Sequence, residues 1–421
     1  MLFNSFLFLC IFFPLVTGLY FVIPHRWRWL LLLMASCWFY MAFVPVYILI
    51  LAFTIGVDYC AGIWIERNEG QRRKLLLTMS IVANLGVLCF FKYFNFLNES
   101  FAAAVRSAGF HYGVPDLGII LPIGLSFHTF QSLSYTIEVY RKHQKAEHRL
   151  GIFALYVMFY PQLVAGPIER PENLLRQINS STPGMGMRSG FDPDRVVAGL
   201  RQMLWGFFKK LVIADRCAVV VEQVYGHPDH YGALSIALAT YLFAIQIYCD
   251  FSGYTDIALG AARVMGFNLM VNFRTPYRSA SVGEFWGRWH ISLSTWFRDY
   301  LYIPLGGNRV VKWRWYYNLM IVFLLSGLWH GAAWTYVIWG ALHGSYLILA
   351  LVFAPMMARY SGLIGLDKLP RLKYALNVFI TFQLVSFAWI FFRAKSIGIA
   401  GTMVHRLGSA PIALDDLRQL L

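Results

Sequence analysis

Two histidines lie in stretches of this sequence where a titratable side chain needs an explanation. His330 stands in SGLWHGAAW, within residues 318–358, an unbroken run that contains no Asp, Glu, Lys or Arg. Desolvating an imidazole costs free energy unless it is hydrogen-bonded or used, and an ionisable residue in a membrane span is a functional candidate by default. A neutral imidazole accepts a proton near neutral pH. His330 is therefore suited to general-base chemistry, in which it would deprotonate a hydroxyl while the hydroxyl oxygen attacks an acyl thioester.

Two other interpretations of His330 stay open on the residues alone. Metal ligation would use His290, His330 and His343, but their separations along the chain form no zinc pattern, so we expect no metal. Helix packing is favoured by Gly327 and Gly331, whose GxxxG spacing permits close backbone approach. The same small residues could instead leave room for an acyl chain beside the imidazole.

The second histidine, His290, lies in residues 250–315, which mix charges and aromatic rings too densely for a lipid-facing span. Such a segment is buried in protein, interfacial, or lines a wet cavity. Trp286, His290 and Ser294 recur at every fourth residue, so on a helix they would share one face. We predict that these three side chains contribute to the site.

The alternative for this segment is an interfacial helix anchored by tryptophans. The anchors would be Trp286, Trp289 and Trp296. On either interpretation, Glu284 and Arg288 have the spacing of a helical ion pair.

The composition indicates a polytopic membrane protein. Of the 421 residues, 58% are hydrophobic and 14% are charged, and the mean hydropathy is +0.54. No train of alternating strands indicates a barrel, so the expected fold class is all-α. The apolar amino terminus is expected to be a retained first span. Apolar runs predict spans near residues 3–23, 30–43, 46–65, 75–96, 118–138, 150–165, 197–215, 231–249, 316–335, 336–357 and 374–392.

The net charge of +15 is spread over connectors, so the positive-inside rule explains it better than nucleic-acid binding. Basic residues near 25–28, 67–74 and 141–149 predict three cytoplasmic loops, with residues 97–117 as an external loop. Lys209 and Lys210 are placed to snorkel toward the headgroups or to bind an anion, and snorkelling is the expected role. The Gly-rich loop at residues 178–195 lacks a preceding strand and a following Lys-Ser or Lys-Thr, so it predicts a plain loop and no P-loop.

No GxSxG, Walker A or HExxH signature occurs, and the six cysteines form no CxxC pair. We expect the cysteines to be buried packing residues. A cysteine relay would depend on Cys217 beside Arg216, which is weak support. Direct transfer assisted by histidine therefore suits this chain better than a serine acyl-enzyme.

Several long motifs, read together, resemble the membrane-bound O-acyltransferase superfamily, and within it the bacterial alginate O-acetyltransferase branch. The motifs are FYPQLVAGPIER (159–170), IYCDFSGYTDIALG (247–260), NFRTPYRSASVGEFWGRWHISLSTWFRDYLYIPLGGNR (272–309) and SGLWHGAAWTYVIWGALHG (326–344). Similarity extends over nearly the whole chain, so we expect one transmembrane domain across residues 1–421. Because members of this branch continue past the equivalent of Leu421, the carboxy-terminal part is expected to be short relative to the family.

The resemblance implies a ring of about ten to eleven transmembrane helices, with re-entrant or interfacial helices around a central tunnel. It places the family's catalytic histidine at His330 and its second signature position at His290, which would act in catalysis as a positioning group or a second proton carrier. Asp250 falls on another family motif, where it would bind substrate or pair with nearby arginines. Trp329 and Trp334 flank His330 and would line the acyl passage.

The function implied is acyl transfer at the bacterial inner membrane. The donor would be a cytoplasmic thioester, acetyl-CoA, used as a substrate with no tightly bound cofactor. The acetyl group would pass toward an exported polysaccharide such as alginate. A periplasmic acetyltransferase and the polysaccharide export machinery are the expected protein partners, besides the lipid bilayer.

Two alternatives come from other classes. A sister enzyme would transfer D-alanine or acylate peptidoglycan from a different thioester. A polytopic transporter would use buried Asp, Arg and His for substrate passage, and inverted repeats would favour it, but none is evident.

Overall fold

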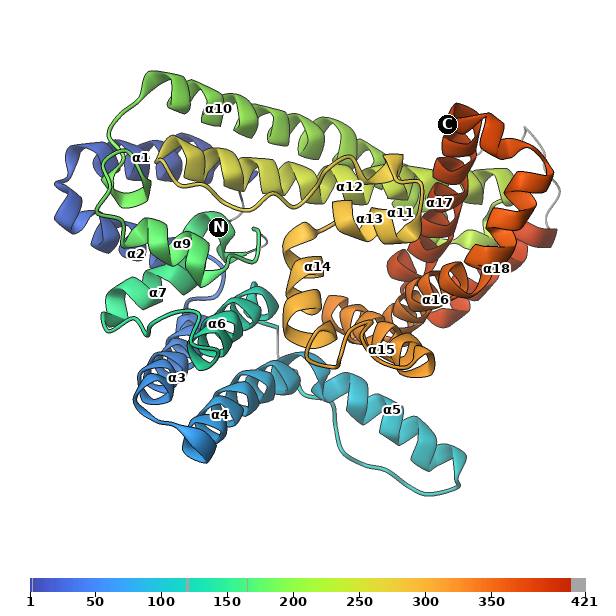
Figure 1. The fold of residues 1–421 in the computed structure, drawn as a ribbon, viewed down its shortest axis with the longest axis horizontal. Helices are drawn as coiled ribbons and strands as arrows, with labels where there is room; N and C mark the ends of the chain where they lie inside the picture. Colours follow the sequence, from blue (N-terminus) through green and yellow to red (C-terminus); the bar gives the residue numbers. More distant parts are fainter. Residues whose placement is uncertain (2, 119–120, 165, 410–421) are drawn as a thin grey trace. The chain divides into compact units, whose positions relative to one another are not determined.

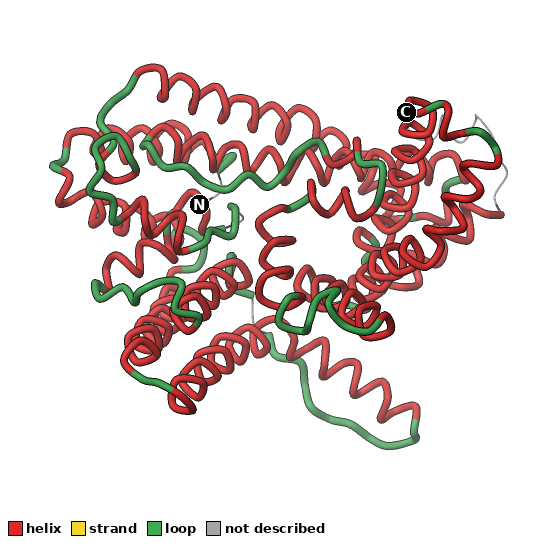
Figure 2. Tube along the Cα trace, viewed as in Figure 1, coloured by secondary structure: helices red, strands yellow, loops and turns green. Residues whose placement is uncertain are grey.

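The computed structural model describes residues 1, 3–118, 121–164 and 166–409. Figures 1 and 2 show that this part of the chain consists of helices and connecting loops, without strands. The predicted all-α class is confirmed. The carboxy-terminal residues 410–421 lie outside the described residues, as do residues 119 and 120 in the predicted span at 118–138.

The chain divides into two compact units, each with its own apolar core. The first contains Met1–Phe207 and Tyr254–Met270, and the second contains Phe208–Gly253 and Val271–Leu421. Helix α12 (Ala233–Val264) contributes its first part to the second unit and its last part to the first unit.

The first unit is built from helices that precede the 208–253 segment. They are α1 (Phe13–Val22), α2 (His25–Met41), α3 (Ile48–Arg67), α4 (Gly70–Leu88), α5 (Phe94–Ser107), α6 (Leu125–Tyr140), α7 (Leu150–Met158), α8 (Tyr160–Leu163), α9 (Pro171–Ile178) and α10 (Pro193–Phe207). Helices α3, α4 and α6 pack on one another, as Figure 1 shows. Buried aromatic rings such as Phe8, Phe39 and Tyr160 fill the core, and such rings dominate apolar burial.

The second unit holds both candidate histidines. Its helices, besides the first part of α12, are α11 (Asp215–Gly226), α13 (Val282–Arg288), α14 (Ile291–Phe297), α15 (Lys312–His330), α16 (Trp334–Leu363), α17 (Pro370–Arg393) and α18 (Ile397–Ser409). Helix α15 packs along α16, and α16 packs along α17. The buried rings of Trp286, Trp339 and Trp389 lie in its core.

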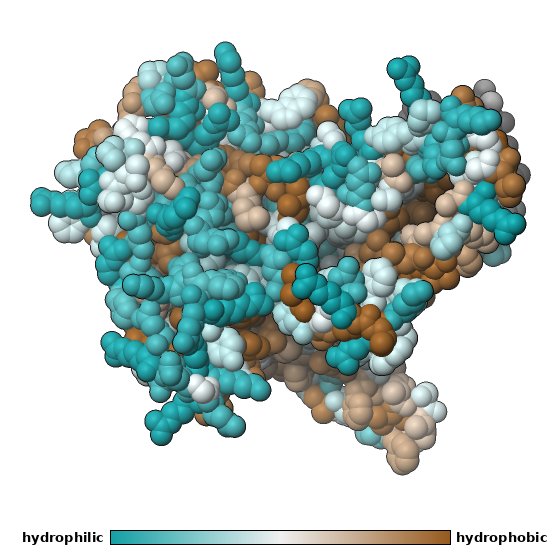
Figure 3. Space-filling model, in the orientation of Figure 1, coloured by the Kyte–Doolittle hydropathy of each residue, from teal (hydrophilic) through white to brown (hydrophobic). Residues whose placement is uncertain are grey.

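Five stretches of the described residues are long and apolar enough to cross a membrane. They are Pro45–Arg67, Gly70–Ser107, Ala233–Val264, Trp334–Leu363 and Pro370–Arg393. Figure 3 shows apolar side chains on the surface over α5, at the lower right. The chain is thus a multi-pass membrane protein, while the predicted number of ten to eleven spans stays a prediction.

Several boundaries differ from the sequence prediction. Residues 150–165 do not form one continuous helix, because the chain turns at Phe159 between α7 and α8. Residues 97–117 were predicted as a loop, but α5 continues to Ser107. Helix α12 extends to Val264, so the motif after Asp250 continues the predicted span at 231–249.

The prediction for the cysteines is wrong for most of them. Cys249 is buried, Cys37 and Cys217 are partly exposed, and the others, Cys10, Cys60 and Cys89, are exposed on the surface of the chain. Apolar surface residues face lipid in a membrane protein, so a hydrophobic sequence context does not distinguish packing from lipid contact.

Candidate active site

The hairpin of α15 and α16 is held together by glycines on facing turns. A Cβ atom at Gly327 would lie 2.2 Å from the carbonyl oxygen of Tyr336, and one at Gly340 would lie 2.3 Å from that of Phe323. The close approach predicted from the GxxxG spacing is therefore confirmed at Gly327. The space beside Gly327 is filled by α16, so this glycine does not leave room for an acyl chain.

His330 is the last residue of α15, immediately before the break at residues 331–333 that separates α15 from α16. Its imidazole lies against three aromatic rings, at centroid distances of 4.9 Å from Trp329, 5.2 Å from Trp339 and 5.2 Å from Phe392. We call these three rings the His330 enclosure. His330 itself is only partly buried, so its imidazole packs against these rings and still keeps an accessible side.

His290 lies next to His330, with 6.4 Å between the two ring centroids. The prediction that Trp286, His290 and Ser294 share one helical face is wrong. His290 has a left-handed backbone, with φ 44°, and separates α13 from α14. The physical reason is Asn272, whose carbonyl oxygen accepts the Ile291 N–H at 2.9 Å and replaces the helical hydrogen bond there.

The environment of His290 fixes its protonation state. The residue is 1% exposed, and its ring lies 4.6 Å from Phe251 and 5.9 Å from Trp329. Burial lowers the pKa of His290 to about 3, because the apolar surroundings disfavour the charged form. His290 is therefore neutral at physiological pH and suits a positioning role.

Trp286 and Ser294 line a largely apolar cavity of about 340 Å³, whose lining also includes Ser326 and Tyr302. The Trp286 indole Nε1–H donates a hydrogen bond to His343 Nδ1 at 3.2 Å. The Ser294 hydroxyl donates to the Trp289 carbonyl at 3.1 Å, across the break at His290.

The tryptophans of the 282–297 segment are not interfacial anchors. Trp286, Trp289 and Trp296 are 9%, 2% and 7% exposed, so this segment is buried in protein. Glu284 and Arg288 form the predicted ion pair on α13.

Asp250 pairs with a lysine rather than with an arginine. Its carboxylate lies 3.0 Å from Lys210 Nζ, which lies 3.0 Å from Asp215 as well. Lys209 is 6% exposed and donates to the Ser252 hydroxyl at 2.9 Å. The expectation that both lysines snorkel is wrong, because α12 supplies acceptors for them.

Asp250 also lines a cavity of about 270 Å³ in the second unit, which we call the Asp250 cavity. Its other polar side chains are Gln246, Tyr336 and Arg393. Phe392 lines this cavity and belongs to the His330 enclosure as well, so the two are neighbours. The Asp250 cavity thus presents one cationic and one anionic side chain next to the His330 enclosure.

The two tryptophans that flank His330 differ. Trp329 is 6% exposed and contacts both histidine rings, whereas Trp334, in the first turn of α16, is 53% exposed. Trp329 therefore belongs to the His330 enclosure. Trp334 lies outside the enclosure, so its expected role in lining the acyl passage stays a prediction.

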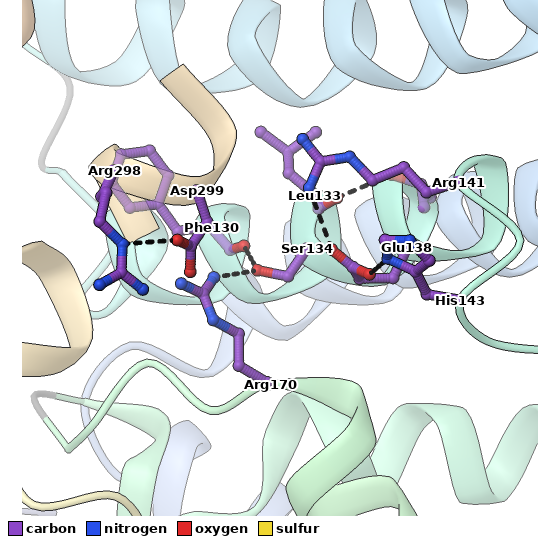
Figure 4. A network of polar contacts seen from close by, with 10 residues as sticks. Phe130, Leu133, Ser134, Glu138, Arg141, His143, Arg170, Arg298 and Asp299 are labelled. Carbon is purple, nitrogen blue, oxygen red and sulfur yellow. Dashed lines mark hydrogen bonds and ion pairs between the residues drawn. The ribbon is translucent and has the colours of Figure 1, made fainter. Parts of the chain in front are cut away.

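The side chains of the motif at 159–170 make their polar contacts within the first unit. Figure 4 shows Arg170 reaching α6, where its Nη1 donates to the Ser134 hydroxyl at 3.3 Å. The neighbouring Glu169 is fully buried and accepts hydrogen bonds from the Met270 amide and from Asn173. Burial raises the pKa of Glu169 to about 7 despite these donors.

Sequence reasoning missed the residues that enclose His330 from other parts of the chain. Trp339 and Phe392 contact its ring, and Arg393 lines the neighbouring cavity. A signal existed for Trp339, since it stands in the same charge-free run as His330. His343, which the sequence offered only as a metal ligand, accepts the Trp286 hydrogen bond. In the part of the chain that the structure describes, no group of three His, Cys, Asp or Glu side chains could hold a metal ion.

Comparison with known proteins assigns the class. The family model of the membrane-bound O-acyltransferase family matches residues 71–394. A probable alginate O-acetylase of Pseudomonas aeruginosa is 40% identical over 97% of this chain and 75% of its own length. One from Azotobacter vinelandii is 39% identical over 96% of this chain and 77% of its own length. A peptidoglycan O-acetyltransferase of Helicobacter pylori is 32% identical, over 94% of this chain and 78% of its own length.

The chain belongs to the membrane-bound O-acyltransferase family. It is therefore a multi-pass membrane enzyme that transfers acyl groups to oxygen, and both His330 and His290 lie within the region that the family model matches.

Proposed function

We propose that this enzyme moves an acetyl group from cytoplasmic acetyl-CoA across the bacterial inner membrane for O-acetylation of an exported polysaccharide, with His330 as general base. The observation that carries the proposal is the His330 enclosure, which holds an imidazole beside His290 and next to the Asp250 cavity. Relatives named alginate O-acetylase support acetyl as the acyl group and alginate as the first acceptor to test.

The proposed step is direct transfer. The acceptor hydroxyl gives its proton to the neutral His330 imidazole while its oxygen bonds to the thioester carbonyl carbon. The carbon–sulfur bond then breaks, and the departing thiolate takes the proton back from the imidazolium. The products are an acetyl ester and free coenzyme A. General-base assistance of this kind contributes about a hundredfold to ten-thousandfold in rate.

The neighbouring residues have distinct roles in this scheme. His290 stays neutral and positions the His330 ring together with Trp329. Asp250 and Arg393 orient the acceptor in the Asp250 cavity through charged and polar contacts. Trp286 and Ser294 line the apolar cavity, where they contact the donor.

A periplasmic acetyltransferase that places the group on the sugar, and the export machinery, are the proposed partners. A second candidate acceptor is peptidoglycan, because a relative named peptidoglycan O-acetyltransferase matches 94% of this chain.

The test is transfer of radiolabelled acetyl from acetyl-CoA in membranes that contain the enzyme and its partner. Alginate and peptidoglycan strands are supplied in parallel, and wild type is compared with His330→Ala at matched protein levels. Label on alginate that disappears in the variant supports the proposal. Label on peptidoglycan alone selects the second acceptor. If wild type transfers no label from acetyl-CoA, the proposal that acetyl-CoA is the donor is wrong.

A further inference from the structure

The first unit contains a polar cavity of about 360 Å³ that no part of the acyl-transfer scheme uses. It is formed by the start of α2, the start of α7 and the loop that follows α9. Its lining includes four basic side chains and no Asp or Glu. The basic residues are His25, Arg26, Arg149 and Arg188. Figure 3 shows a largely hydrophilic surface over α7 and α9.

The positive charge in this cavity is only partly compensated. Arg149 Nε lies 3.0 Å from Glu147, whose carboxylate also accepts a hydrogen bond from Asn179. Arg26 and Arg188 make no ion pair within the described residues, and the nearest recorded contact of Arg26 is the Trp27 ring at 5.9 Å. Two guanidinium groups are thus available to an anion, and the third has one carboxylate partner.

Hydrogen bonds from two buried side chains of the first unit fix the loop that carries Arg188. Arg28 is 4% exposed and donates to the carbonyl oxygens of Met187 at 3.2 Å and Ser189 at 2.6 Å. The Tyr20 hydroxyl donates to the Gly186 carbonyl at 3.0 Å, and Gly186 adopts φ +52°, which favours glycine. These contacts fix the backbone before any ligand arrives, so binding at this loop costs less ordering entropy.

The positive-inside rule explains basic residues near these loops, but it does not explain a cavity that also contains hydrogen-bonding side chains. Asn179, Ser180 and Ser181 add amide and hydroxyl groups to the lining, and Trp29 forms one wall. Trp29 packs so tightly that a Cβ atom at Gly151 would lie 2.4 Å from its ring.

The basic residues also stand where a helix disfavours them. Arg26 lies in the first turn of α2, and Arg149 precedes the first residue of α7. A cation at a helix amino terminus opposes the macrodipole, whereas an anion there is favourable. A bound anion would offset both the helix dipoles and the repulsion among the arginines.

We propose that this cavity is a phosphate-binding site, in which Arg26, Arg149 and Arg188 hold the phosphate group of an anionic ligand. Arginine presents paired N–H donors that match phosphate oxygens, and hydroxyl groups complete such sites. The phosphate belongs to the headgroup of an anionic phospholipid or to a soluble phosphorylated compound. The site is independent of the proposed acyl transfer, since no step of that scheme uses it.

Binding to the purified full chain in uncharged detergent tests the proposal. The lipid probe is dioctanoyl phosphatidylglycerol, with dioctanoyl phosphatidylcholine as its zwitterionic control, and the soluble probe is inorganic pyrophosphate. The test variant is Arg26→Gln with Arg188→Gln. The matched control is Arg67→Gln with Arg72→Gln, which removes the same charge from two exposed arginines of another predicted cytoplasmic loop.

We expect saturable binding that weakens about thirtyfold in the test variant, which corresponds to about 1 kcal/mol per arginine near an anionic group. The control variant should bind as wild type does. Phosphatidylglycerol binding alone assigns the site to lipid, and pyrophosphate binding alone assigns it to a soluble phosphate.

Equal weakening in both variants, or saturable binding of neither probe, overturns the site. Arg26→Lys with Arg188→Lys retains the charge but loses the paired donors, so it should bind more tightly than the glutamine variant and more weakly than wild type, which separates loss of the site from misfolding. The experiment measures ligand binding and not acyl transfer. The phosphate site can therefore be refuted while the proposed function stands, and the proposed function can be refuted while the phosphate site stands.

Discussion

Gly327→Ala is expected to impair catalysis although it adds only a single methyl group. The new Cβ atom would lie 2.2 Å from the Tyr336 carbonyl oxygen, whereas ordinary contacts begin at 3.4 Å. The two helices must therefore separate or tilt until these two atoms reach an ordinary contact. Overpacking of this kind costs about 1–3 kcal/mol. Since α16 carries Trp339, the separation moves one wall of the His330 enclosure, and a misplacement of about 1 Å can cost about a hundredfold in rate.

The assay is acyl transfer by purified enzyme in detergent, normalised to the monodisperse fraction, together with the melting temperature. The matched control is Gly401→Ala in α18, because a Cβ atom at Gly401 meets nothing within 4 Å. We expect the control to transfer as wild type does and to gain up to about 1 kcal/mol in stability. A Gly327→Ala enzyme with the wild-type rate would refute the claim that the close α15–α16 approach positions His330.

Three further predictions concern charge and protonation. Asp250→Asn should raise the KM for the acceptor about tenfold, the cost of one polar contact, with little change in melting temperature, since Lys210 keeps Asp215 as a partner; an unchanged KM removes Asp250 from the acceptor site. His290 has a folded pKa of about 3, below its ordinary 6.5, so its contribution to stability is complete above pH 6.5 and falls by about 2 kcal/mol by pH 5; melting curves of His290→Gln should lack that acid loss, and an identical loss in the variant counts against a neutral buried imidazole. Glu169 has the opposite sign: its pKa is raised from 4.5 to about 7, so its contribution is complete below pH 4.5 and about 3 kcal/mol is lost as the pH rises through 7. Glu169→Gln, which mimics the protonated acid, should melt with a flatter profile between pH 5 and 8, and an unaltered profile rejects the assignment.

The sequence was informative where a single residue contradicts its surroundings. His330 stands out because no charged residue occurs in the long apolar run around it, and His290 follows from the charged, aromatic character of its segment. The GxxxG spacing predicted close packing because only small side chains permit it, and Gly327 lies against Tyr336.

Other features depend on partners far away in the chain, which a local pattern does not reveal. The break at His290 requires Asn272, whose backbone and side chain accept the amides of Ile291 and Ser292. A continuous helix was therefore the natural but wrong prediction for Trp286 and Ser294. Lys209 is buried because Ser252, much later in the chain, accepts its hydrogen bond.

The walls of the site illustrate the same limit. Phe392 and Arg393 end α17, two helices after His330, and their local sequence gave no reason to select them. Composition and periodicity predict that such helices exist, while the contacts among them follow from tertiary packing.

The most direct test of the central claim is single-turnover release of coenzyme A from acetyl-CoA in the presence of a hydroxyl acceptor. Purified wild type is compared with His330→Ala, with His111→Ala as an exposed-histidine control, and acetyl-CoA binding is measured on each protein. The account predicts that His330→Ala binds the donor normally and releases coenzyme A about a hundredfold to ten-thousandfold more slowly, while His111→Ala matches wild type. Acceptor-dependent release at the wild-type rate by a folded His330→Ala protein would contradict it.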